Sequence, residues 1–523
     1  MTARKVRQSR SRLLANRILL AGLVLLAIAA VYGAAGVSHP IALGAGTPAS
    51  PADRLAVTSA LLGCPAPGSG GATGGGLAVA TLPASAGQGQ VVLTPASPAG
   101  GSLTAGSVTT SPQPGQLVVS KIKTAPVVPK KLATMPVMAA GLAPTYLARG
   151  GLIISASQSS AQGLDVEQLG TDGQPTARCQ APGSDFWFVG PVAPALHIQM
   201  FLLNTDSQPA DVSVSVQTDS GPMIGVQDSG IVVPPHAMVV QRLDKLLHAA
   251  KAVGLHIVTS TGRIVAAVRE TTDVAGRPGA WLPAAEQPAT TQVLPGLPAT
   301  AGTRELFLTV PGNGAAQVKV TAVTPRGSYQ PTGGNGISLL GHLTTGIAIP
   351  ALGGYPGSIK VSANVPVTAT LEVPGGASGA PGAFTVGADA ITEQAVIAAS
   401  PAGRAGTTEL VLSAPGRAAS VRIMRAAPGS LLTGSAGTIV KIAGKSATEV
   451  RVSLPKRAGK ASLIGIVVTP LPGSGPVYAA RIAMVGGAVQ AILPVVSSPT
   501  SVQLSDASES LLAILGSLSP RPG

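Results

Sequence analysis

Short stretches in which apolar and polar residues alternate, or in which apolar residues run together, recur along most of the chain. In the first part they lie at residues 77–82, 90–94, 116–122 and 151–156, each bounded by Gly and Pro. Alternation with a period of two places one face of a strand against a core, and Gly and Pro favour the turns between strands. Residues 54–182 are therefore predicted to form an antiparallel β module.

Beyond residue 182 a pattern of strands repeats. The segment Glu305–Gly312 (ELFLTVPG) matches Glu409–Gly416 (ELVLSAPG) at an offset of 104 residues, and a weaker copy begins at Met200. An alternating strand and further apolar strands follow each copy. Repetition at this period is typical of tandem domains, because the units of a solenoid run about 20 to 50 residues. The predicted fold class is all-β, with tandem immunoglobulin-like β-sandwich modules at 183–285, 286–396 and 397–496.

The amino terminus has a different pattern. Six basic residues lie within residues 1–17, and an uncharged apolar run extends from Ile18 to Val37. Twenty helical residues span the roughly 30 Å hydrocarbon layer of a bilayer, and the basic flank stays in the cytoplasm. We expect one retained transmembrane helix at 18–37, a linker at 38–53 and the bulk of the chain outside the cell membrane. Cleavage as a signal peptide near Gly33 is the alternative.

Composition supports this division. The chain has 523 residues, too many for one core, with 66 Gly, 46 Pro and only 11% charged residues. The mean hydropathy is positive, which argues against a disordered chain despite the many Gly and Pro residues. One helix is expected at Gln241–Val253, and residues 497–523 are expected to form a tail.

The net charge of +14 is unevenly distributed. Residues 404–481 hold eleven basic residues and only two acidic ones, Glu409 and Glu449. Outside a cell such a cluster would attract anionic lipid or wall polymer, with a merely solubilising surface as the alternative. Nucleic acid is not an expected partner, since the chain has too few aromatic residues for base stacking. The candidate residues for binding an anionic polymer are Arg417, Arg422, Arg425, Lys441, Lys445, Arg451, Lys456, Arg457 and Lys460.

The two cysteines, Cys64 and Cys179, are predicted to form one disulfide, because an isolated pair in an oxidising compartment most simply does so. No catalytic constellation, metal site or cofactor site is predicted. The six histidines have no ligand spacing. The Ser-x-x-Lys pattern at Ser453–Lys456 contains Pro455, which argues against the helix that such an enzyme motif requires.

Two further groups each allow two interpretations. The aromatic residues Phe186, Trp187, Phe188 and Phe201 are expected to pack in a core, and a carbohydrate-stacking platform is the alternative. The acidic residues of the first sandwich are expected to be solvated turn residues, with a calcium site as the alternative. These acidic residues include Asp206, Asp211, Asp219 and Asp228.

A resemblance can be given on particular motifs. Cys64-Pro65 before a Gly-rich loop, Cys179 followed by Asp185–Gly190, and the strand ending at Asn204 resemble an uncharacterised actinobacterial envelope family, domain of unknown function 5719. The resemblance implies a membrane-anchored extracellular β protein without an assigned activity. Residues 121–138 depart from the family pattern, which leaves the strand order of the first module open.

The expected function is that of a non-enzymatic scaffold or interaction protein of the cell envelope, which binds anionic envelope polymer or envelope proteins. The alternative is an accessory or degenerate enzyme subunit of envelope polysaccharide assembly that uses a groove between modules.

Overall fold

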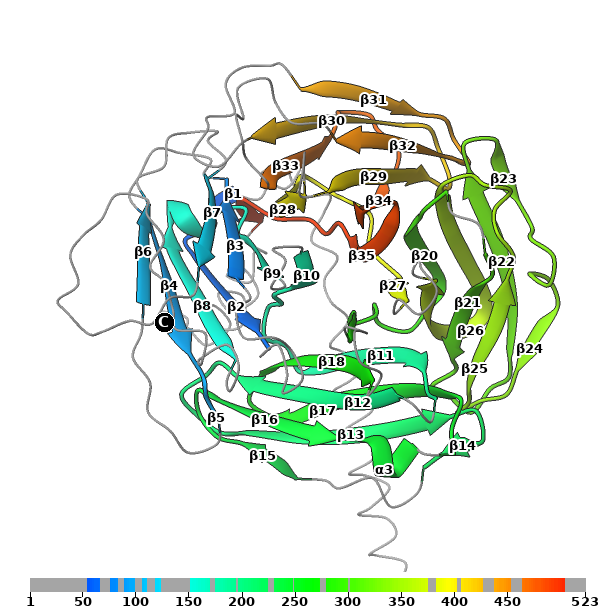
Figure 1. The fold of residues 1–523 in the computed structure, drawn as a ribbon, viewed down its shortest axis with the longest axis horizontal. Helices are drawn as coiled ribbons and strands as arrows, with labels where there is room; N and C mark the ends of the chain where they lie inside the picture. Colours follow the sequence, from blue (N-terminus) through cyan, green and yellow to red (C-terminus); the bar gives the residue numbers. More distant parts are fainter. Residues whose placement is uncertain are drawn as a thin grey trace, which may run out of the picture. The chain divides into compact units, whose positions relative to one another are not determined.

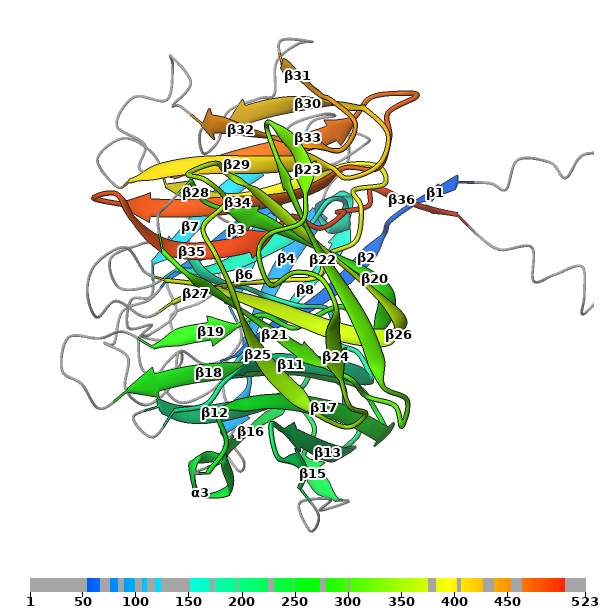
Figure 2. The ribbon, with the colours of Figure 1, turned by 90° about the vertical axis from the view of Figure 1, so that its right-hand side faces the viewer.

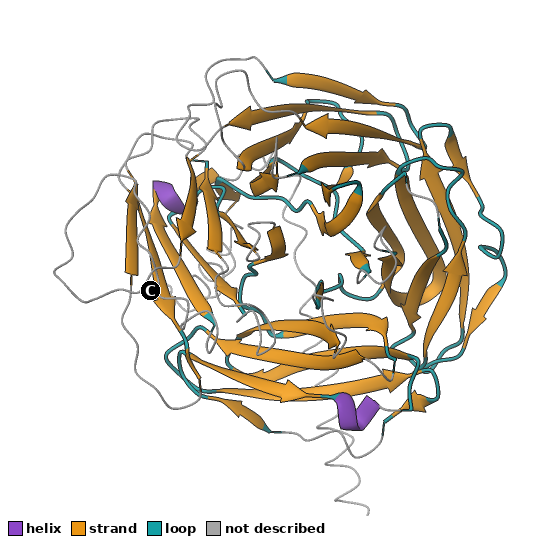
Figure 3. Cartoon of the chain, in the orientation of Figure 1, coloured by secondary structure: helices purple, strands orange, loops and turns teal. Residues whose placement is uncertain are grey.

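The structure is a computed structural model, and strands dominate it (Figure 3). Its longest helix, α3 (Asp244–Leu247), has four residues, so no helix in the described ranges is long enough to cross a membrane. The predicted helix at 18–37 and its flanks lie outside those ranges. The structure describes residues 54–65, 76–82, 89–98, 106–110, 118–123, 151–169, 175–193, 196–223, 230–247, 249–272, 279–299, 302–374, 382–401, 406–426, 437–452 and 463–503.

The described residues from 54 to 502 form one compact unit, in which the strands build four two-sheet modules. Module 1 contains β2 (Ser59–Cys64), β3 (Gly76–Thr81), β4 (Gly89–Pro95), β6 (Gly106–Thr110), β7 (Val118–Lys123), β8 (Leu152–Gln158), the 3-10 turn η1 (Ser159–Ala161), β9 (Asp165–Leu169) and β10 (Pro175–Arg178). Module 2 contains β11 (Asp185–Pro191), β12 (Leu196–Asn204), β13 (Ala210–Thr218), β14 (Gly221–Pro222), β15 (Ile231–Val233), β16 (Ala237–Arg242), α3, β17 (Ala252–Thr261), β18 (Ile264–Thr272) and β19 (Ala280–Leu282).

Module 3 contains β20 (Ala289–Leu297), β21 (Arg304–Thr309), β22 (Ala316–Thr324), β23 (Gly327–Tyr329), β24 (Ile337–Leu339), β25 (Thr344–Ile349), β26 (Gly357–Val373) and β27 (Ala383–Val386). Module 4 contains β28 (Ala395–Pro401), β29 (Thr407–Ala414), β30 (Ala419–Ala426), β31 (Thr438–Ile442), β32 (Ser446–Val452), β33 (Leu463–Pro470), β34 (Tyr478–Val485) and β35 (Ala488–Pro494). Three short strands lie between modules: β1 (Arg54–Ala56), β5 (Ser97–Pro98) and β36 (Ser501–Gln503).

All four modules share one strand order. When the main strands of a module are numbered one to eight along the chain, one sheet has the order 1-6-3-4 and the other 8-7-2-5. Module 4 shows this as β28-β33-β30-β31 and β35-β34-β29-β32, and module 1 as β2-β8-β4-β6 and β10-β9-β3-β7. In module 3 the long strand β26 serves as sixth and seventh strand, since residues 357–363 pair in one sheet and residues 368–373 in the other.

This order refines the predicted fold. The all-β class and the paired sheets are confirmed, and module 1, which the sequence did not reveal as a copy, has the same order as the three predicted repeats. An immunoglobulin domain pairs its first strand with its second. Here the first strand pairs with the sixth, so the observed order differs from the immunoglobulin one.

The helix predicted at Gln241–Val253 is wrong. Strand β16 runs to Arg242, one helical turn follows, and β17 begins at Ala252. Leu243 and Leu247 are buried in the module core, so the turn has apolar anchors. A single turn is too short to be stable by itself, and the alternation of Val253, Leu255 and Ile257 into the core favours a strand immediately after it.

The modules follow one another in chain order, and module 4 returns to module 1 (Figures 1 and 2). Apolar contacts join each pair of neighbours, for example Phe307 of module 3 with Val189 of module 2. Ala78 and Leu82 of module 1 pack against Val396 and Ala398 of module 4. Strand β1 also pairs with β36, so the two ends of this unit lie together.

Candidate functional site: the central cavity

A cavity of about 680 Å³ lies where the four modules meet. Its walls include residues of the eighth strand of every module, β10, β19, β27 and β35, and of the segments that follow them. Figure 1 shows β10, β27 and β35 as the strands nearest the centre. Because each module contributes the same strand, the cavity results from the repeated topology and from closure of module 4 on module 1.

The cavity walls are mainly apolar. Leu62, Phe384, Leu493 and many alanines line them, together with the half-buried ring of Trp281. Trp281 packs against Phe201, with ring centroids 5.3 Å apart, and the guanidinium of Arg269 lies over the Trp281 ring at 5.6 Å. The size and lining are those of a small-molecule site, which typically has about 300–1,000 Å³ and mostly apolar walls.

Two ionisable side chains line the described walls, Arg178 and Glu286. Glu286 is half-buried in the segment after β19, and burial together with the nearby Asp389 raises the pKa of its carboxyl group. Arg178 ends β10, and its side chain is 22% exposed. The cavity therefore offers one permanently charged cation in an otherwise mostly apolar lining.

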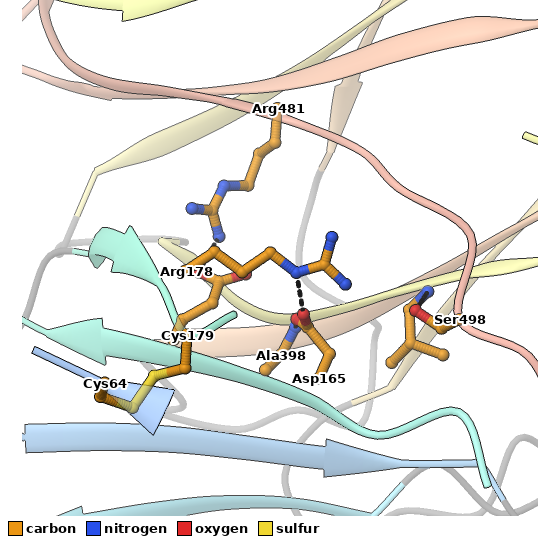
Figure 4. Close-up of polar contacts among 9 residues, drawn as sticks. Cys64, Asp165, Arg178, Cys179, Ala398, Arg481 and Ser498 are labelled. Carbon is orange, nitrogen blue, oxygen red and sulfur yellow. Dashed lines mark hydrogen bonds and ion pairs between the residues drawn. A yellow bond between two sulfur atoms is a disulfide. The ribbon is translucent and has the colours of Figure 1, made fainter. Parts of the chain in front are cut away.

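Arg178 belongs to a polar cluster that joins module 1 to module 4 (Figure 4). Its Nε donates to Oδ1 of the buried Asp165 at 2.6 Å, and the backbone N–H of Ala398 donates to Oδ2 of Asp165 at 2.7 Å. Nη1 of Arg481 donates to Oε2 of Glu167 at 2.6 Å, with both side chains at most 3% exposed. Burial raises the pKa of Glu167 even though Arg481 opposes that change.

The predicted disulfide between Cys64 and Cys179 is confirmed, with the two Cα atoms 4.5 Å apart. It fixes the residue next to Arg178, and the backbone of Gly63 pairs with that of Gln180 beside it. Cys179 itself lines the cavity. The staple thus holds β10, and with it the guanidinium group of Arg178, against the rest of module 1.

A second group of ionisable residues lies behind the wall between modules 2 and 3. Glu305 and Glu372 are directly opposite each other on β21 and β26. Burial and the charge of Glu305 raise the pKa of Glu372 to about 7. Burial, and secondarily the charge of Glu372, raises the pKa of Glu270 well above its usual range, and Glu270 Oε1 has no hydrogen-bond partner in the described structure. Among the described residues no group of acidic, histidine or cysteine side chains has the arrangement of a metal site.

The residues of the predicted basic surface of module 4 differ in their exposure to solvent. Arg417, Lys441 and Lys445 are exposed, whereas Arg422 and Arg425 are half-buried. Arg451 is exposed but forms an ion pair with Glu409 at 3.1 Å. Lys456, Arg457 and Lys460 lie outside the described residues. Binding of an anionic polymer by this surface therefore stays a prediction.

The aromatic and acidic residues singled out from the sequence lie mostly in the described part of module 2. Phe186, Trp187, Phe188 and Phe201 are buried, and Trp187 stacks on His256 with centroids 4.0 Å apart, so they pack as the core interpretation predicted. Asp206 pairs with Arg263, Asp211 accepts from Thr261 and Asp219 accepts from the backbone of Lys251. Asp228 and the Ser453–Lys456 motif lie outside the described ranges.

Sequence reasoning missed Arg178, Asp165 and Trp281. Two signals were available: Arg178 is adjacent to Cys179, and Asp165 and Glu167 have the i, i+2 spacing that places side chains on one face of a strand. Nothing in the sequence places Asp165 beside Ala398, which lies 233 residues away.

Comparisons with known proteins give one match. The sequence model of a family described as "Family of unknown function (DUF5719)" matches residues 148–453. No curated protein and no solved structure matches the chain. The match begins just before β8 and ends just after β32, so it cuts through modules 1 and 4.

Proposed function

Since the chain belongs to the family of unknown function DUF5719, whose description assigns no activity, we propose a function from the central cavity. The protein is a non-enzymatic binding protein of the cell envelope, held at the outer side of the membrane by its amino-terminal segment. Its cavity encloses an apolar or amphiphilic small molecule. The observation that carries this proposal is the cavity of about 680 Å³ with walls from all four modules.

The nature of the walls supports a binding role. Burying apolar ligand surface is favourable by roughly 25 cal/mol per Å², and walls formed by Leu62, Trp281, Phe384 and Leu493 supply matching apolar surface. The walls are held by a disulfide and by packed sheets, so the site exists before the ligand arrives. A preformed site saves the ligand the cost of ordering the protein.

The predicted transmembrane segment favours a membrane-derived ligand. Val57 and Val502, next to the two ends of the described unit, both line the cavity. Val57 follows the predicted transmembrane segment, Ile18–Val37, by 20 residues. A molecule that partitions into the bilayer would therefore be concentrated close to the chain that carries the cavity.

The proposal is tested by purifying the full chain from membranes, extracting it with organic solvent and quantifying apolar compounds by mass spectrometry. Ala181→Trp and Gln490→Trp place bulky side chains at two lining positions in different modules. Each is expected to reduce the extracted ligand at least several-fold. Ala443→Trp, at an exposed position outside the lining, is the matched control and should leave it unchanged. Equal amounts of ligand in all four proteins, or none in the unsubstituted chain, would contradict a binding role for the cavity.

A further inference from the structure

The guanidinium group of Arg178 is held in place by one of its five N–H donors and leaves the others open. Nε donates to Asp165, and neither Nη1 nor Nη2 has a hydrogen-bond partner in the described structure. Figure 4 shows the guanidinium extending past Asp165 toward Ser498, which also lines the cavity. Two parallel Nη–H groups on a planar cation match the two oxygens of a carboxylate or phosphate group.

Asp165 orients the guanidinium group of Arg178 through Nε and leaves the two Nη groups available for a ligand. Both carboxylate oxygens of Asp165 are engaged, one by Arg178 and the other by the backbone N–H of Ala398. Asp165 is 2% exposed and cannot turn toward the cavity without leaving the Ala398 N–H unpaired. Because the arginine side chain is already ordered by Asp165, a ligand anion would not have to immobilise it.

The neighbouring arginine, Arg481, also has N–H groups that donate no hydrogen bond within the described structure. Arg481 is 1% exposed, and its Nε and Nη2 have no hydrogen-bond partner among the described atoms. Burial moreover favours the neutral form of Glu167, the partner of Arg481. A ligand in the cavity can contact only Arg178 of these two arginines, because Arg481 does not line the wall, but the charge of Arg481 adds to the positive potential behind it.

We infer that the ligand is an acidic amphiphile, whose single carboxylate or phosphate head binds the Nη groups of Arg178 while its apolar body fills the cavity. This inference rests on the proposed binding function and assigns its specificity. Glu286, the other ionisable lining residue, disfavours a second acidic group on the apolar body.

The test uses the full chain in uncharged phosphatidylcholine nanodiscs and measures quenching of tryptophan fluorescence by brominated C18 chains. Trp281 lies in the wall, and the only other tryptophan is the buried Trp187. Three probes share one chain and differ in the head group: dibromostearate, dibromostearyl phosphate and dibromostearyl alcohol. We expect one or both acids to bind roughly tenfold to a hundredfold more tightly than the alcohol, because hydrogen bonds to charged groups differ from neutral ones by that order.

Arg178→Gln should remove this preference for the acid while leaving affinity for the alcohol unchanged. Asp165→Asn keeps the cation of Arg178 but replaces one of the two acceptor oxygens that orient it with an NH2 group, so it should weaken the preference without abolishing it. Arg263→Gln, at an exposed arginine paired with Asp206 and outside the lining, is the control and should behave as the unsubstituted chain. Melting temperatures of all variants identify any that fail to fold.

The outcomes separate the two proposals. If all three probes bind equally and Ala181→Trp blocks them, the cavity binds apolar molecules and the assignment of Arg178 is wrong. If a brominated quaternary ammonium chain binds more tightly than the acids, and Glu286→Gln removes that binding, the head group is cationic and the inference is overturned. If no probe binds the unsubstituted chain, the proposed function itself fails. Inorganic phosphate alone should not displace the acidic probes at equal concentration, because it lacks the apolar body.

Discussion

Arg481 and Glu167 form an ion pair that is almost completely removed from water and lies at the junction of modules 1 and 4. The two residues are 314 positions apart in the chain. Arg263 and Asp206, 57 positions apart, also pair, but their side chains are 53% and 26% exposed. Solvent screens an exposed pair, whereas a buried charge that loses its partner keeps its full desolvation cost. Residue type alone therefore does not indicate what an arginine contributes.

Removing one member of the buried pair should be costly. Arg481→Met leaves Glu167 buried without its partner, and we expect a loss of about 3–5 kcal/mol in the free energy of unfolding, measured by urea denaturation. The double variant Arg481→Met with Glu167→Gln should recover most of that loss, because neither position then carries an unpaired buried charge. Arg263→Gln, at the more exposed pair with Asp206, should cost less than about 1 kcal/mol. A small loss in Arg481→Met would mean that this pair does not hold the junction.

At the scale of elements, β21 and β26 bring Glu305 and Glu372 directly opposite each other in module 3. Like charges opposite each other on neighbouring strands are destabilising by up to about 1 kcal/mol. The protein limits this repulsion by holding a proton on Glu372, whose pKa is raised to about 7. Strand β26 serves as both the sixth and the seventh strand of module 3. Glu372 therefore lies on the element that links the two sheets of the module.

This pair predicts a pH dependence of stability. Between pH 4.5 and about 7 the folded chain keeps the Glu372 proton while the unfolded chain loses it, so the folded state binds more protons and stability falls as pH rises through this window. Glu372→Gln should remove this contribution and raise the urea midpoint at pH 8 while changing it little at pH 4.5. Glu305→Gln, which removes only the opposing charge, should reduce the dependence in part. Parallel stability–pH curves for Glu372→Gln and the unsubstituted chain would rule out this role. The remaining slope in Glu372→Gln would report the other glutamates whose pKa is raised, among them Glu270, Glu167 and Glu286.

At the scale of the whole molecule, closure of four similar modules determines where the site is. None of the modules holds the cavity alone, because each contributes one inner strand and its following segment. The family match to residues 148–453 omits β2 to β7 and β33 to β35, which complete modules 1 and 4. The cavity residues of β35 also lie outside the match, so the site extends beyond the part of the chain that the family model covers.

The proposed membrane attachment can also be tested at this scale. The full chain is expected to stay with membranes after a carbonate wash, because a hydrophobic helix of twenty residues partitions stably into a bilayer. A cysteine introduced at the exposed Ala443 should react with a membrane-impermeant maleimide on intact cells, and one introduced at Ser9 should react only after permeabilisation. Release into the medium of a chain that begins near Gly36 would establish cleavage instead of anchoring.

The sequence by itself determined the strand-rich class, the strands at 77–82, 90–94 and 151–156, the repeat at 104 residues and the pairing of Cys64 with Cys179. These features depend on local periodicity, turn residues and the presence of only two thiols. The strand order, the likeness of module 1 to the repeats and the cavity were decided by tertiary structure. Their cause is contact between segments hundreds of residues apart, as where Asp165 orients Arg178 only because closure of the chain brings the Ala398 N–H to it. A local pattern carries no information about such a contact, since burial of either partner depends on the arrangement of all four modules.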